Sequence, residues 1–223
     1  PQRLGYRRDA RGWLLTHPVP VARPPAIPPH ESYYYLELLR RAGLLEELPT
    51  VDRVNLSPDP ALVQEMQSRL TESGARDRAL RVVLAPGAAY GSAKCWLPER
   101  FAEVADRLVE TRGAAILLCG TPAEARLGEE IARRMKSPPI SFIGKTTLPE
   151  FFALLSCANF FIGNDSGAMH LAAAAGLPQV IIFGPTDENG TAPLNPRARL
   201  VRQPTGCSPC FLRRCPIDHR CMT

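Results

Sequence analysis

The sequence predicts an α/β fold in which residues 76–203 form a doubly wound, Rossmann-like domain around a parallel sheet. Two observations predict it. Short apolar runs alternate with stretches of helical periodicity, and apolar residues follow one another in these runs rather than standing at every second position. Strands of that kind are buried on both faces, as they are when helices cover both sides of a parallel sheet. Right-handed crossovers then give the doubly wound arrangement.

The segment before the first apolar run has a different character. Residues 17–30 are rich in proline, which fixes φ and removes N–H donors, so regular helix and central strand are excluded there. A helix is predicted over residues 31–45, a linker over 49–58 and a second helix over 60–73.

From residue 80 onward, strands and helices alternate. The predicted strands cover residues 80–85, 114–120, 140–144, 159–163 and 179–184. The predicted helices cover residues 98–113, 122–135 and 148–158, and an alanine-rich helix begins near residue 167. Ligands of such sheets bind beyond the carboxyl ends of the strands, so we expect the functional residues in the strand-to-helix loops.

The loop after the fourth strand, "GNDSGA" at 163–168, opens the alanine-rich helix. Unpaired N–H groups at a helix N-terminus favour an anion. Asp165 or Ser166 is placed to cap this helix, and Gly167 leaves room for a ligand against the backbone. His170 lies above the helix start. The alternative is that Asp165 is only a cap and His170 only a packed side chain.

The loop after the first strand, residues 85–98, consists largely of small residues. Small residues such as Gly87 let backbone amides approach a phosphate, and Lys94 would supply a point charge. The loop is neither a Walker A motif nor G-x-G-x-x-G, and an ordinary surface lysine is the alternative. Glu124, near the start of the next helix, either accepts hydrogen bonds from ribose hydroxyls or is a partner of the helix dipole.

Four of the seven cysteines gather in the C-terminal tail as C-x2-C-x4-C-x5-C, at Cys207, Cys210, Cys215 and Cys221. Clustered thiols of this kind indicate a structural zinc site or an iron–sulfur site. Only the first pair has the usual zinc spacing, so disulfides or free thiols in a basic loop are the alternative. The arginines of the tail are further candidates for contacts with phosphorylated acceptor sugars.

Composition restricts the partners. The formal net charge of +5 favours an anionic partner, such as phosphates, an acidic glycolipid or a lipid surface, although solubility explains it equally well. Nucleic acid is disfavoured, because the few aromatic residues do not alternate with basic ones. No run of about 18 apolar residues predicts a transmembrane segment, and no signal-peptide pattern is present, so we expect a cytoplasmic chain.

These loops together resemble one known family. The segments "PGAAYGSAKCWLPERFAEVADRL", "CGTPAE", "FIGNDSGAMHLAAAAGLPQVIIFGPTDE" and "CSPCFLRRCPIDHRCM" resemble the ADP-heptose:lipopolysaccharide heptosyltransferases, most of all the heptosyltransferase II branch. The stretch "LGYRRDARGWLLTHPV" resembles the part of that family that closes its N-terminal domain.

The resemblance implies a GT-B glycosyltransferase, in which two Rossmann-like domains face each other. Residues 1–75 would then be a remnant of the acceptor-side N-terminal domain with its linker. Residues 76–203 would be the donor domain and 204–223 a basic, cysteine-rich tail. The implied reaction moves L-glycero-D-manno-heptose from ADP-heptose to the inner core of lipopolysaccharide, with inversion and without a metal or other cofactor. Its place would be the inner face of the inner membrane, where the enzyme would be peripheral.

The resemblance also implies roles for individual residues. Lys94 would contact the donor phosphates and stabilise the leaving ADP, and Gly87, Ala89 and Tyr90 would line the same loop. Glu124 would approach the ribose of the adenosine. The residues that would contact the diphosphate and sugar are Asp165, Ser166, Gly167 and His170.

The general base of the family is an aspartate in a part of the N-terminal domain that has no counterpart in this sequence. We therefore expect the isolated chain to bind the donor without transferring heptose. Two other functions remain open. One is another GT-B nucleotide-sugar enzyme, such as an epimerase, which would prefer a UDP-sugar. The other is a non-catalytic nucleotide- or metal-binding module built around the tail.

Overall fold

The structure is a computed structural model that describes residues 2–223. The chain divides into two compact units: the N-terminal residues up to Val51 together with Asp187–Ala192, and Asp52–Thr186 together with Pro193–Thr223. This division falls ahead of helix α2 (Pro60–Glu72), whereas the sequence placed a boundary after it, at residues 75 and 76. The reason is that α2 buries Met66 and Leu70 in the same core as α5 (Leu148–Ser156).

The smaller unit contains a two-stranded parallel sheet of β1 (Leu4–Tyr6) and β2 (His17–Val19), the short 3-10 helix η1 (Arg11–Leu14) and two helices, α1 (Glu31–Arg41) and α7 (Glu188–Thr191). Strand β2 includes a proline in the stretch where the sequence excluded a central strand. A two-stranded sheet has only edge strands, and these tolerate proline. The predicted helix over 31–45 ends at Arg41 because the chain turns at Gly43, which has a φ of 74°.

A buried carboxylate lies on α1. Glu37 is 2% exposed and accepts hydrogen bonds from Arg40 at 2.7 and 2.9 Å and from Arg41 at 2.6 Å. The hydrogen bonds from Arg40 and then Arg41 outweigh burial, and together with the charges of both arginines they lower the pKa of Glu37 to about 2. The charged form of Glu37 therefore stabilises this unit.

The larger unit is built on a sheet of six parallel strands in the order β5-β4-β3-β6-β7-β8, which confirms the predicted α/β class. The strands are β3 (Leu80–Ala85), β4 (Ala114–Leu118), β5 (Ile140–Ser141), β6 (Phe160–Asn164), β7 (Gln179–Phe183) and β8 (Ala198–Arg202). All but the last lie within or close to the predicted ranges, although β5 has only two residues.

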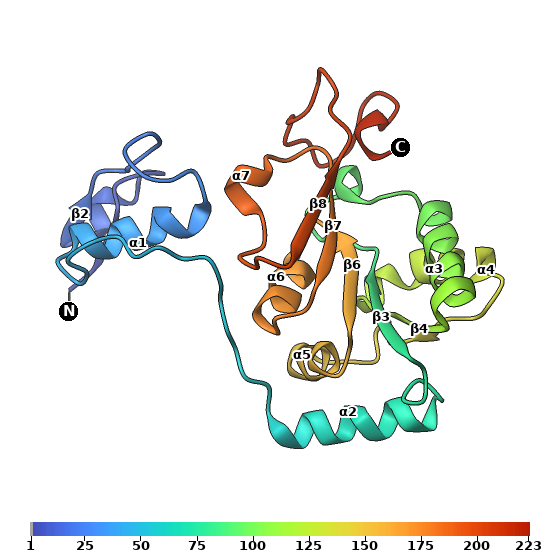
Figure 1. The fold of residues 1–223 in the computed structure, drawn as a ribbon. Coiled ribbons are helices and arrows are strands. Elements are labelled where there is room, and N and C mark those ends of the chain that lie inside the picture. The colour runs from blue at the N-terminus through green and yellow to red at the C-terminus, as the bar shows by residue number, and fades with distance from the viewer. Residues whose placement is uncertain (1) are drawn as a thin grey trace. The chain divides into compact units, whose positions relative to one another are not determined.

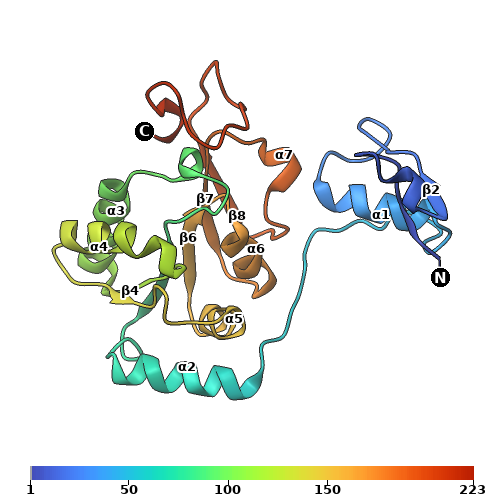
Figure 2. The same ribbon diagram turned by 180° about the vertical axis from the view of Figure 1, so that it is seen from behind.

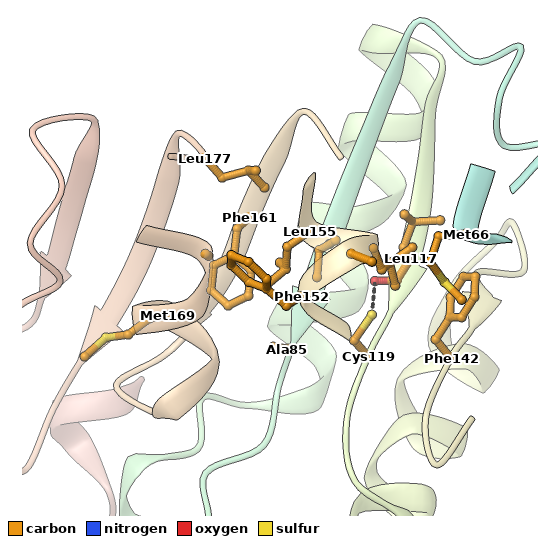
Figure 3. Packing of buried hydrophobic residues seen from close by; sticks show 14 of the residues in the cluster. Met66, Ala85, Leu117, Cys119, Phe142, Phe152, Leu155, Phe161, Met169 and Leu177 are labelled. Atoms are coloured by element: carbon orange, nitrogen blue, oxygen red, sulfur yellow. Dashed lines mark hydrogen bonds between the residues drawn. The ribbon is translucent and has the colours of Figure 1, made fainter. Parts of the chain in front are cut away.

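Helices cover both faces of this sheet (Figures 1 and 2). Helices α3 (Pro98–Arg112) and α4 (Ala125–Arg134) lie on one face, and α5, α6 (Gly167–Ala174) and α2 lie on the other. Alternate residues of one strand enter different cores: Val83 packs on the α5 side and Val82 on the α3 side. Figure 3 shows part of the α5-side core, where Met66 comes from α2, Leu117 from β4 and Phe142 from the loop after β5.

The strand order fixes where a ligand site is expected. The chain proceeds from β3 to β4 and β5 in one direction, then returns to β6 beside β3 and proceeds to β7 and β8 in the other. The order therefore reverses between β3 and β6, and ligands of open α/β sheets bind beyond the carboxyl ends of the strands at such a reversal. Among residues 2–223, the structure contains no helix that is both long and apolar enough to cross a membrane.

Candidate functional site

An ion pair marks the reversal point. The loop after β3 ends in a short 3-10 helix, η2 (Ser92–Lys94), and the Lys94 ammonium donates to Asp165 Oδ2 at 2.5 Å. Thr186, which follows β7, donates its hydroxyl to the same oxygen at 2.6 Å. The side chains of Lys94 and Asp165 are 12% and 5% exposed. Three adjacent strand ends thus meet at one carboxylate.

The side chain of Asn164 holds the β3 loop in place from beneath. Asn164 is the last residue of β6 and is fully buried. Its Nδ2 donates to the Pro86 carbonyl at 2.6 Å, and its Oδ1 accepts from the Trp96 amide at 3.1 Å. One amide therefore fastens both ends of the loop that presents Lys94. Sequence reasoning missed Asn164, although a buried polar residue directly after an apolar strand is a recognisable signal.

The N-terminus of α6 lies beside this ion pair in the chain. Ser166 is the N-cap residue in extended conformation, but its side chain makes no capping hydrogen bond. In the part of the chain that the structure describes, Ser166 Oγ is buried and lacks a hydrogen-bond partner. Apart from its two chain neighbours and the backbone of α6, no heavy atom of residues 2–223 lies within 4 Å of a Cβ built on Gly167. His170 is exposed one turn further along the helix. The expected cap is thus absent, and the start of α6 is open.

Glu124 lies against the start of the loop that follows β3. It ends the 3-10 helix η3 (Pro122–Glu124), and its Oε2 accepts from the Thr121 amide at 2.6 Å and hydroxyl at 3.0 Å. A Cβ on Gly87 would lie 1.5 Å from Glu124 Oε1, so the carboxylate occupies the space that Gly87 leaves. Burial, and after it the charge of Glu124, raises the pKa of the Cys95 thiol. Glu124 therefore caps a helix and also faces the Lys94 loop.

The other side of the loop carries Ala89 and Tyr90, both exposed. The Tyr90 hydroxyl donates to the Phe211 carbonyl at 2.6 Å, and the Ala93 amide donates to the Arg213 carbonyl at 3.1 Å. His219 Nε2 lies 2.8 Å from the Ala93 carbonyl. The C-terminal tail, residues 204–223, is therefore attached to the loop, as Figure 1 also shows at the carboxyl end of the sheet.

The described residues give no support for a metal site in the tail. All seven cysteines are free thiols, and over residues 2–223 no group of three or more His, Cys, Asp or Glu is placed to hold a metal ion. The expected zinc site is therefore not supported. Instead, Cys221 and Met222 are buried in the α3-side core, and the amides of Cys210 and Phe211 donate to the Pro185 carbonyl. Burial, followed by the nearby Cys207 thiol, raises the pKa of Cys221.

Two cavities are lined by other residues. One, of about 360 Å³, lies in the smaller unit between Arg8, Arg23 and Tyr34. The other, of about 490 Å³, lies at the opposite end of the large sheet, where Arg81 is the second residue of β3 and Asn159 precedes β6. Neither includes a residue that the sequence proposed for donor binding.

Comparison with known proteins places this geometry in a family. A model of glycosyltransferase family 9 (heptosyltransferase) matches residues 1–220. The chain is 38% identical over 144 residues to lipooligosaccharide heptosyltransferase 2 of Campylobacter jejuni, covering 62% of this chain and 45% of the relative. It is 34% identical over 125 residues to lipopolysaccharide heptosyltransferase 2 of Escherichia coli K12, covering 54% and 36%. The chain thus spans less than half the length of these curated relatives.

Solved structures agree with this assignment. The structure of E. coli ADP-heptose lps heptosyltransferase II superimposes with a TM-score of 0.77 and 27% identity, covering 92% of this chain and 63% of that one. A family 9 glycosyltransferase of Veillonella parvula shares the fold, with a TM-score of 0.78, 23% identity and coverage of 90% and 56%. The expected resemblance is confirmed: the chain belongs to glycosyltransferase family 9, the heptosyltransferases.

Proposed function

We propose that this chain is the donor-binding part of a heptosyltransferase that moves L-glycero-D-manno-heptose from ADP-heptose to the inner core of lipopolysaccharide. The observation that carries the proposal is the position of Lys94, whose ammonium lies at the strand-order reversal beside the open start of α6. An ammonium and free helix amides are the groups that bind a diphosphate. Membership of family 9 supports heptose as the sugar.

The proposed chemistry is displacement at the anomeric carbon. An acceptor hydroxyl attacks that carbon, the bond from the carbon to the phosphate oxygen breaks, and ADP leaves with the electron pair. Lys94 and the amides at the start of α6 stabilise the developing negative charge, and the unpaired Ser166 hydroxyl has a donor to add. We propose that these groups suffice without a metal and that attack from the opposite face inverts the anomeric centre.

The proton of the acceptor hydroxyl needs a base, and the carboxylates of the candidate site are engaged. Asp165 accepts from Lys94 and Thr186, and Glu124 accepts twice from Thr121. We therefore propose that the 223-residue chain binds the donor but transfers no heptose by itself. Detection of heptose transfer from ADP-heptose to an inner-core lipopolysaccharide acceptor by this chain alone would refute that part of the proposal.

We further propose that the protein works at the cytoplasmic face of the inner membrane as a peripheral enzyme. Three apolar side chains of the tail are largely exposed: Phe211 is 55%, Leu212 44% and Ile217 63% exposed. Together with the net charge of +5, they fit an anionic lipid surface. Co-sedimentation with vesicles containing phosphatidylglycerol, and not with pure phosphatidylcholine, is the expected result; equal or absent co-sedimentation would contradict it.

The donor site is tested by calorimetric titration of ADP and of UDP into the chain. ADP should bind more tightly than UDP, and Lys94→Met should weaken ADP binding by about 1.5–3 kcal/mol, the range for a hydrogen bond to a charged group. Because Lys94→Met also leaves Asp165 uncompensated, the double variant Lys94→Met/Asp165→Asn is measured beside it. A preference for UDP would favour the epimerase alternative, and no binding of either nucleotide would overturn the proposed site.

A further inference from the structure

The C-terminal tail packs closely against the loop after β3, which carries Lys94. Its backbone approaches the loop so closely that a Cβ on Gly91 would lie 2.2 Å from the Arg213 carbonyl oxygen. The same carbonyl accepts from the Ala93 amide at 3.1 Å, directly before Lys94 in the chain. These two contacts fix the position of Arg213 relative to the loop that carries the proposed phosphate-binding lysine.

The side chain of Arg213 also points to this loop. Its guanidinium carbon lies 5.1 Å from the centre of the Tyr90 ring, and Lys94 Nζ lies 4.8 Å from the same centre. The Tyr90 ring is held by the hydrogen bond from its hydroxyl to the Phe211 carbonyl. Two cations therefore lie against one fixed aromatic ring, whose π electrons attract both.

Lys94 and Arg213 differ in whether a carboxylate balances their charge. Lys94 is paired with Asp165, as described above. Arg220, in the same tail, is paired with Asp218 at 2.7 Å. Arg213 has no carboxylate within ion-pair distance in the described part of the chain, residues 2–223, and its side chain is exposed. The site thus carries one positive charge that no acidic side chain balances, although repulsion from Lys94 opposes its presence there.

We propose that Arg213 is a second cationic contact for the diphosphate of the donor, so that the tail forms one wall of the donor site. This inference rests on the proposed function. A guanidinium offers a planar pair of N–H donors that matches two phosphate oxygens, while Lys94 acts as a point charge beside it. The anion would relieve the repulsion between the two cations.

The test compares ADP with adenosine, since only ADP carries the diphosphate. Both are titrated calorimetrically into the wild-type chain and into Arg213→Ala, Arg213→Lys and Arg214→Ala. Arg214 is the matched control, because it is the next residue, is also exposed, and has no contact with Tyr90. Arg213→Ala should weaken ADP binding about tenfold, as expected for loss of one charge-assisted hydrogen bond, and leave adenosine binding unchanged. Arg213→Lys should recover part of the loss, and Arg214→Ala should bind ADP as the wild type does.

The outcomes separate this inference from the proposed function. If the wild-type chain binds no ADP, the proposed donor site fails and the inference fails with it. If the wild type binds ADP and Arg213→Ala binds it equally well, the inference alone is wrong. Equal losses for ADP and adenosine in Arg213→Ala would also overturn it, because Arg213 would then only maintain the shape of the loop.

Discussion

Replacing Asn164 by alanine should destabilise the large unit by several kcal/mol, because its side chain pairs two backbone groups inside the candidate site. The side chain is fully buried, and its two hydrogen bonds pair the Pro86 carbonyl and the Trp96 amide. Alanine leaves both backbone groups unpaired, at about 1–3 kcal/mol each. The expected loss is therefore about 2–6 kcal/mol, a large part of the roughly 5–15 kcal/mol that holds a domain folded.

Asn159→Ala is a matched control, because Asn159 directly precedes β6 and Asn164 is its last residue. Asn159 is exposed, and its side chain accepts one hydrogen bond, from the Arg81 amide at 2.9 Å. Water can replace that bond, so the cost should stay below about 1 kcal/mol. The comparison therefore isolates burial and double pairing from the chemistry of an asparagine-to-alanine change.

Urea unfolding followed by tryptophan fluorescence measures both variants. The chain has two tryptophans, and Trp13 belongs to the smaller unit. In a Trp13→Phe background, Trp96 alone reports the unfolding of the loop and its sheet. With a slope of about 2 kcal/mol per molar urea, the midpoint of Asn164→Ala should fall by about 1–3 M. A midpoint no lower than that of Asn159→Ala would refute the conclusion that this amide fastens the loop.

Three further substitutions test the contacts of Gly87, Gly91 and Glu37. Gly87→Ala should displace the Glu124 carboxylate, because Oε1 would lie 1.5 Å from the new Cβ. The loss of about 1 kcal/mol of helix capping should lower the melting temperature by a few degrees. An unchanged melting temperature would contradict this prediction. Gly91→Ala should detach the tail through its collision with the Arg213 carbonyl, seen as faster limited proteolysis near the C-terminus than in wild type. Glu37 has a folded-state pKa of about 2, below its unfolded value, so its stabilising effect is complete above about pH 4.5 and is lost as the pH falls toward 2. Glu37→Gln should remove that part of the acid sensitivity of the smaller unit, measured by circular dichroism during acid titration.

The sheet was predictable because its signal is local. A strand buried on both faces carries a continuous apolar run, and β3, β4, β6 and β7 each contain one, at residues 82–85, 114–118, 160–163 and 180–183. Strand β8 was missed because it is an edge strand whose five residues include Arg199 and Arg202, so its sequence does not have that pattern. The predicted strand over 140–144 shortened to Ile140–Ser141 because the chain turns at Gly144, which has a φ of 68°.

The site was predictable only in part, for a related reason. Parallel strands bring their carboxyl ends to one edge, so the loops of Lys94 and Asp165 had to approach each other, although their pairing had not been foreseen. Asn164 was missed because its partners are backbone groups, and any sequence supplies those. The tail contacts were missed because Tyr90 and Phe211 are far apart in the chain. The predicted zinc site is not supported, because cysteine spacing shows only that the thiols are near one another in sequence and not that they form a coordination shell.

The ion pair at the reversal point explains why one cation would be a poor donor site. A carboxylate as buried as Asp165 requires a compensating charge, and Lys94 provides it. A diphosphate that approached Lys94 alone would compete with Asp165 for the same ammonium and would place negative charge next to that carboxylate. If Arg213 binds the diphosphate as proposed, this conflict is smaller, because Arg213 adds a cation that no carboxylate shares, while Thr186 continues to donate to Asp165. A lysine ammonium has three N–H donors, so Lys94 can then stay paired with Asp165 through one and contact the leaving ADP through another.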